Sequence, residues 1–120
     1  MSKRTAGTIA RTWWATPEKA VLPLLAVLEP HTIFIEVCGG DGALVRILEA
    51  AGHVCTYACD VDPRHDSVTW DDALQVTPEF GETVITNPPF ALACEVWEAC
   101  WPHLAVVVLH PIYEDILLLI

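Results

Sequence analysis

The run from Thr32 to Gly42, TIFIEVCGGDG, is a short apolar segment that leads directly into a glycine-rich turn. Its first six residues are β-branched or apolar apart from Glu36, and two glycines follow shortly after, which is typical of a buried strand ending in a turn. The next segment, 43–51 (ALVRILEAA), has a helical pattern and precedes Gly52, a residue suited to closing a helix. This strand, turn and helix predict the first unit of an α/β domain.

Apolar strands and helical segments continue to alternate along the rest of the chain. Such continuous apolar strands are typical of a parallel sheet covered by helices on both faces. We therefore expect the α/β class, with a Rossmann-like, doubly wound and mostly parallel sheet of about five strands. Thr16 is the expected N-cap of the first helix, which Pro23 either kinks or precedes. The expected strands are 32–37, 54–58, 67–70, 82–86 and 104–110, and the expected helices are 17–28, 43–51 and 91–101.

Length and composition limit the number of domains and the classes of protein to which the chain can belong. A chain of 120 residues suffices for one domain, and 53% hydrophobic with 18% charged residues excludes an intrinsically disordered chain. We expect a flexible arm over 1–12 and a single domain over 13–120. The longest uncharged run, 99–113, is too short for a membrane span, so no membrane is expected. The five cysteines form no C-x-x-C pair, which predicts reduced thiols, no metal site and a cytoplasmic location.

The charge balance bears on the possible partners. The formal net charge is −10, and every Lys and Arg lies at or before Arg64. An acidic domain of this kind should repel a phosphate backbone rather than bind it.

Distinctive polar residues fall at the expected ends of strands, where ligands bind in such sheets. Gly40 and Gly42 allow a tight turn and a close backbone approach to a ligand, although a purely structural turn is the alternative. No Gly-Lys-Ser/Thr follows, which disfavours a phosphate loop. Asp60 and Asp62 lie about twenty residues further on, where an acid accepts hydrogen bonds from ribose hydroxyls. Asp72 follows the third expected strand, and for all three acids a solvated loop is the alternative.

The most specific element is Asn87-Pro88-Pro89-Phe90, directly after the fourth expected strand. The two prolines stiffen the loop and remove backbone donors, which leaves carbonyl oxygens free to accept hydrogen bonds. Asn87 adds a side-chain carbonyl, and Phe90 adds a flat apolar face for stacking. A plain strand-ending turn is the alternative.

Together these motifs resemble the class I S-adenosylmethionine-dependent amino-methyltransferases, above all the N6-adenine DNA methyltransferases. The resemblance runs from about Trp14 to Phe90 in the family's order. It implies an enzyme that uses S-adenosyl-L-methionine to methylate an exocyclic amino group, with N6 of adenine in DNA as the leading substrate. The implied cofactor-binding residues are Thr16, Pro17, Glu36, Gly40, Gly42, Asp60, Asp62, Asp72 and Asn87, and the implied catalytic residues are Asn87, Pro88 and Phe90.

The family's mechanism is direct methyl transfer without a metal. The Asn87 side chain and the Pro88 carbonyl would hold the substrate amino group, and Phe90 would stack on a flipped base. Two alternatives remain open. One is a cofactor-binding module without catalysis, and the other is an amino-methyltransferase that acts on a protein glutamine or on RNA.

The chain departs from the family after Phe90. It has no segment long enough for a target-recognition region, and the sheet is expected to lack the usual C-terminal strand hairpin. The fifth strand would then have an exposed edge. This edge is covered either by 116–120 or by a second chain, as a homo-oligomer or with a partner.

Overall fold

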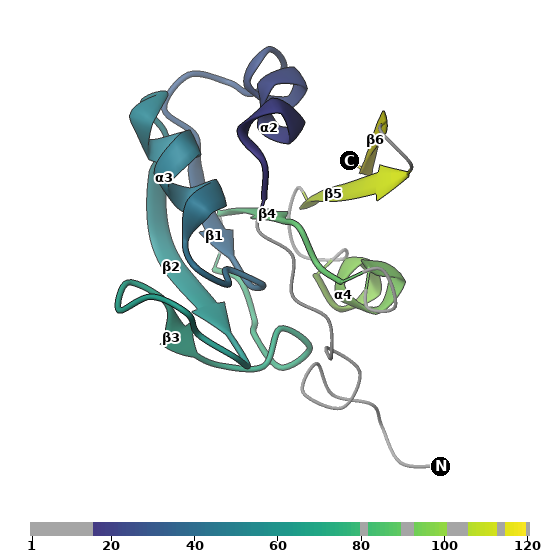
Figure 1. The fold of residues 1–120 in the computed structure, drawn as a ribbon. Helices are drawn as coiled ribbons and strands as arrows, with labels where there is room; N and C mark the ends of the chain where they lie inside the picture. The colour runs from purple at the N-terminus through teal and green to yellow at the C-terminus, as the bar shows by residue number, and fades with distance from the viewer. Residues whose placement is uncertain (1–15, 80–81, 90–92, 101–105, 113–114, 120) are drawn as a thin grey trace.

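The computed structural model describes residues 16–79, 82–89, 93–100, 106–112 and 115–119, the last two ranges by their backbone (Figure 1). The expected arm over 1–12 lies outside these residues. The described elements follow the order that the sequence predicts, with one further strand after β5. The elements are α2 (Glu18–Leu25), β1 (Ile33–Glu36), α3 (Ala43–Ala50), β2 (Val54–Asp60), β3 (Thr69–Trp70), β4 (Thr83–Thr86), α4 (Ala93–Cys100), β5 (Val106–Ile112) and β6 (Asp115–Leu119).

The strands form one sheet in the order β3-β2-β1-β4-β5-β6. β1 is parallel to both of its neighbours, β2 and β4, and β5 is parallel to β4. The prediction of an α/β domain with a parallel sheet is therefore confirmed.

The end of the sheet differs from the prediction. Asp115–Leu119 forms β6, which pairs antiparallel with β5 from Ile112↔Asp115 to Val108↔Leu119. The sheet thus has six strands instead of about five, and it does not stop at an unpaired β5. The physical reason is that the outer N–H and C=O groups of β5 need partners, and the apolar segment after it supplies them. The edge proposed for a second chain is therefore occupied by this chain itself.

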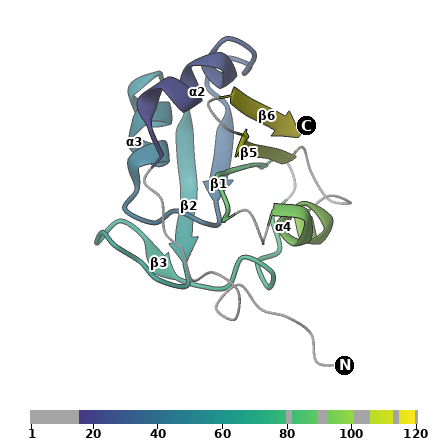
Figure 2. The ribbon, with the colours of Figure 1, turned by 45° about the vertical axis from the view of Figure 1, so that its right-hand side comes forward.

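Helices pack on both faces of the sheet (Figure 2). Neighbouring strand residues point to opposite faces, so Phe34 and Ile35 enter different clusters. The cluster of Phe34 includes residues of α2 and α3, and that of Ile35 includes Val96 of α4. The buried members of the first are Val21, Leu24, Phe34, Leu44, Val45, Leu48 and Ile85, and those of the second are Ile35, Val37, Cys59, Ala73, Val84 and Val96.

The helix ends refine the expected boundaries. Pro17, and not Thr16, is the N-cap of α2, which makes no side-chain capping bond and contains Pro23 within it. After α3, Gly52 has φ +96° and its N–H donates to the Glu49 carbonyl at 3.0 Å, while the His53 N–H donates to the Leu48 carbonyl at 3.1 Å. These two bonds form a Schellman motif, which confirms Gly52 as the residue that ends the helix. None of the helices in the described ranges is long and apolar enough to cross a membrane.

Candidate functional site

The strand order reverses between β1 and β4, because the chain passes from β1 to β2 on one side and reaches β4 on the other. Beyond the carboxyl ends of strands at such a point, the loops diverge and leave a crevice that binds ligands. Here β1 ends at Glu36 and leads into the glycine turn, and β4 ends at Thr86 and leads into Asn87. Two of the motifs singled out in the sequence therefore lie side by side.

The glycine turn is held against the end of β2. Gly40 and Gly42 have φ values of +54° and +81°, which side chains disfavour. The Gly40 N–H donates to Asp60 Oδ2 at 2.8 Å, and the Gly39 N–H donates to the Cys59 carbonyl at 2.8 Å. A Cβ on Gly39 would lie 3.3 Å from the Cys59 oxygen and from a Val68 methyl group. Gly39 was not among the site residues predicted from the sequence. The feature that could have indicated it is its position directly before Gly40, as the first of two consecutive glycines.

Glu36 is a carboxyl group enclosed by protein, with 1% of its surface exposed. Its Oε1 accepts hydrogen bonds from the Cys38 N–H at 2.8 Å and from the Thr86 hydroxyl. Burial raises the pKa of Glu36 to about 8, against the opposing effect of these hydrogen bonds and of one from the Asn87 N–H. The group therefore carries a proton over much of the range below neutral pH.

Asp60, the last residue of β2, joins two loops. Its Oδ2 accepts from the Gly40 N–H and its Oδ1 from the Asp62 N–H, both at 2.8 Å. Burial raises its pKa above the ordinary value, while the two N–H donors lower it. Since a carboxylate oxygen can accept more than one hydrogen bond, Asp60 retains capacity for a ligand hydroxyl. The Asp62 side chain instead points to Arg64 in an exposed ion pair of 2.8 Å.

Asp72 lies at the same edge of the sheet, but its side chain accepts a hydrogen bond from the backbone of the turn that it begins. It is buried, and its Oδ1 accepts from the Leu74 N–H at 3.0 Å. The preceding Asp71 is tied to β2, because its N–H donates to the Asp60 carbonyl at 3.1 Å and its Oδ2 accepts from the Tyr57 hydroxyl at 2.6 Å. The bond to Asp71 raises the pKa of Tyr57 to about 12.

Asn87 connects the loop after β4 with the segment before α2. Its Nδ2 donates to Thr16 Oγ1 at 3.2 Å, across 71 positions of sequence. The structure thus brings together the first and the last of the sequence motifs. Pro88 is buried and Pro17 is exposed, and Phe90 lies outside the described residues.

A hollow of about 590 Å³ lies elsewhere on the molecule. It is lined by residues in the middle of β2, by the β3–β4 connection and by the residue just before β4. Its position reflects the connection from β3 to β4, which holds a turn and no helix over its described part. The lining residues are Ile35, Thr56, Tyr57, Asp71, Gln75, Val76, Thr77, Glu79 and Glu82.

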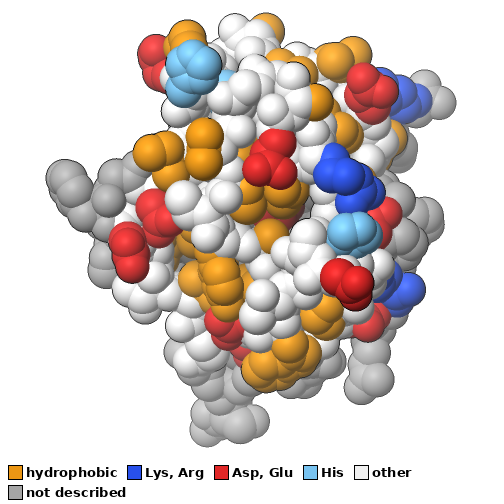
Figure 3. Space-filling model, turned by 90° about the vertical axis from the view of Figure 1, so that its left-hand side faces the viewer, with side chains coloured by type: hydrophobic (Ala, Val, Ile, Leu, Met, Phe, Trp, Pro, Cys, Tyr) orange, Lys and Arg blue, Asp and Glu red, His pale blue; other side chains and the backbone are white. Residues whose placement is uncertain are grey.

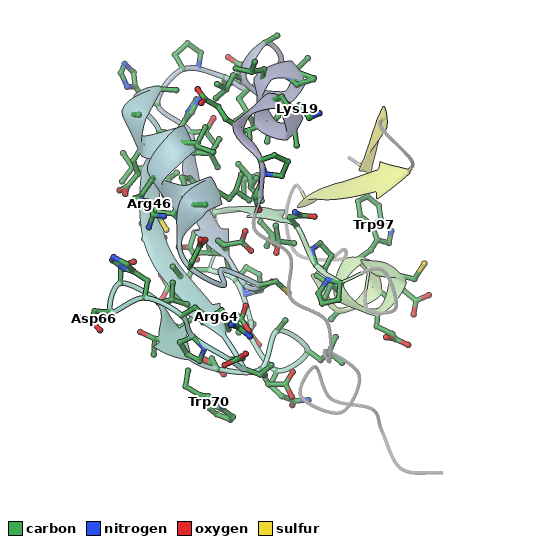
Figure 4. The ribbon with its side chains drawn as sticks, viewed as in Figure 1. Lys19, Arg46, Arg64, Asp66, Trp70 and Trp97 are labelled. Atoms are coloured by element: carbon green, nitrogen blue, oxygen red, sulfur yellow. The ribbon has the colours of Figure 1, made fainter. Side chains whose placement is uncertain are left out.

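The charges of the described residues offer no extended basic surface on the face shown in Figure 3, where acidic and apolar side chains are interspersed. The basic residues of the described ranges are Lys19, Arg46 and Arg64, which lie apart from one another in Figure 4. Arg46 Nη1 donates to the Asp41 carbonyl at 2.7 Å, and Arg64 pairs with Asp62. Two of the three are thus engaged within the protein.

Comparisons of the chain with models of known protein families and with curated proteins find no match. Among the described residues, no group of three or more His, Cys, Asp or Glu side chains is placed to hold a metal ion.

Proposed function

We propose that this domain binds S-adenosyl-L-methionine beyond the carboxyl ends of β1, β2 and β4 and methylates an exocyclic amino group, with N6 of adenine in DNA as the first substrate to test. The observation that carries the proposal is the meeting of three motifs at one point of the parallel sheet. The glycine turn and Asn87 follow adjacent strands, and Asn87 is bonded to Thr16.

The residues at this point fit the cofactor. Gly40 and Gly42 have positive φ values and carry no side chains, so a ligand can approach the backbone of the turn closely. Asp60 presents a carboxylate at the end of the neighbouring strand, suited to the two hydroxyls of a ribose. Thr16, Pro17 and Glu36 would lie toward the methionine part, and Asp62 and Asp72 toward the adenosine part.

The reaction needs an acceptor that orients the substrate nitrogen. Asn87 Nδ2 donates to Thr16, and this directs the other end of the amide, Oδ1, to accept an N–H from the substrate. When bound, S-adenosyl-L-methionine supplies a sulfonium methyl group that the nitrogen lone pair takes, while the sulfur keeps the electron pair of the broken bond and the displaced proton passes to water. Asn87 and the Pro88 carbonyl would position the nitrogen, and Phe90 would stack on its ring.

The net charge of −10 favours an acceptor other than a bare duplex, or a basic partner that supplies phosphate contacts. The search for the acceptor should therefore include DNA, RNA and protein.

The test is a calorimetric titration of the chain with S-adenosyl-L-methionine. We expect saturable binding, weakened roughly 10- to 100-fold by Asp60→Ala, since hydrogen bonds to a charged group are worth ~1.5–3 kcal/mol. Asp66→Ala is the matched control, because Asp66 is exposed on the connection that follows Asp60 and points away from the molecule in Figure 4. Asn87→Ala should lose methyl transfer, with a smaller loss of cofactor binding than Asp60→Ala. A folded chain that shows no binding would refute the proposal.

A further inference from the structure

Glu36 and Thr86 are the last residues of two neighbouring parallel strands, and their side chains are bonded to each other 50 positions apart. Both are buried, with exposed fractions of 1% and 0%. The sequence motifs include Glu36 but not Thr86, and the proposed reaction assigns Thr86 no role.

The bonds of the Glu36 carboxylate reach both loops of the site. On one side it accepts from the Cys38 N–H at 2.8 Å, at the start of the glycine turn. On the other it accepts from the hydroxyl of Thr86, the residue directly before the Asn-Pro-Pro loop. Burial excludes the water that would compete for these hydrogen bonds, and they become stronger when Glu36 loses its proton and accepts them as a charged carboxylate.

We propose that Thr86 and Glu36 form a positioning pair, which holds the Asn87 loop at a fixed place relative to the glycine turn. This inference rests on the proposed function, because the geometry it preserves is that between the amide acceptor and the cofactor. Neither side chain need touch the substrate. A displacement of about 1 Å between reacting groups costs up to roughly 100-fold in rate, so a buried tether of this kind has a direct consequence for catalysis.

The protonation of Glu36 should affect the hydrogen bonds at the start of both loops, so both loops should respond to pH. The charge of Asp60, at the end of β2, raises the pKa of Glu36. The charge of Glu36 in turn raises the pKa of the thiols of Cys55 and Cys59 in β2 and of Cys38 after β1. Because the thiols have raised pKa values, Glu36 should be the group that titrates near neutral pH. Its titration should be sensed together by the backbone amides of Cys38 and Asn87.

The experiment compares the wild-type chain with Thr86→Val, which removes the hydroxyl at nearly constant volume, and with Thr86→Ser, which keeps it. The pH-dependent chemical shifts of the Cys38 and Asn87 amides should follow one midpoint in the wild-type chain. In Thr86→Val the midpoint should rise by roughly one pH unit, since a donor to the charged form is lost, and in Thr86→Ser it should stay. Glu36→Gln should abolish the shared inflection and retain the acceptor oxygen.

The kinetic readout uses the acceptor that the wild-type chain methylates. Thr86→Val should lower kcat by roughly ten-fold or more with little change in KM for the cofactor, and Thr86→Ser should restore it. Separate midpoints for the two amides, or an unchanged midpoint in Thr86→Val, would overturn the positioning pair. Absence of cofactor binding by the wild-type chain would instead overturn the proposed function, and the amide titration distinguishes the two failures.

Discussion

Replacing Glu36 by Gln should remove a large pH dependence from the stability of this domain. The folded-state pKa of Glu36 is raised from 4.5 to about 8 by burial. Between these values the folded chain binds a proton that the unfolded chain does not, so the free energy of unfolding falls as pH rises. At 1.36 kcal/mol per pH unit, the full interval corresponds to ~5 kcal/mol, a large share of the 5–15 kcal/mol that typically stabilises a domain.

The assay is urea unfolding, followed by tryptophan fluorescence, at several pH values between about 5 and 8. Glu36→Gln keeps an oxygen acceptor for Cys38 and Thr86 but carries no charge, so the two proteins should be similar in stability near pH 5. The stability of Glu36→Gln relative to the wild-type chain should then grow by ~4 kcal/mol toward pH 8. The comparison cancels the general effect of the acidic net charge, because the two folded chains carry the same charge as long as Glu36 is protonated. Parallel pH profiles for the two proteins would show that Glu36 is not buried as described.

Two further predictions concern packing and the acidic edge of the sheet. Leu48→Ala in α3 should lower the free energy of unfolding by ~2–5 kcal/mol, because Leu48 is fully buried. The control Leu22→Ala in α2, at a position 53% exposed, should change it by less than about 0.5 kcal/mol, and equal losses would contradict the packing. Asp71→Asn should lower the pKa of Tyr57 from about 12 toward its ordinary value of 10, as measured by phenolate absorbance against pH. An unchanged titration would exclude the bond between the two side chains.

The order of elements follows from local signals in the sequence. A β-branched and apolar run forms a strand, and a helix ends where Gly52 can adopt a positive φ, because these preferences act over a few neighbouring residues. The positions of Gly40, Asp60 and Asn87 at strand ends are local in the same sense, so the sequence was sufficient to place them at one edge of a parallel sheet. The prediction that Thr16 is the N-cap of α2 was wrong by one residue, since patterns of Ser, Thr and Pro locate the start of a helix only approximately.

Other features depend on contacts between distant parts of the chain. Pairing of β6 with β5 was one of two alternatives that the sequence left open, because the apolar run after the fifth strand can cover its edge or leave that edge to a second chain. Only the contacts of the folded chain decide between them. The bonds from Thr86 to Glu36 and from Asn87 to Thr16 join positions 50 and 71 apart, which no local pattern encodes. The sequence alone thus identifies the residue types at the site. The burial of Glu36 and its shifted pKa arise only when folding brings the ends of two strands together and excludes water between them.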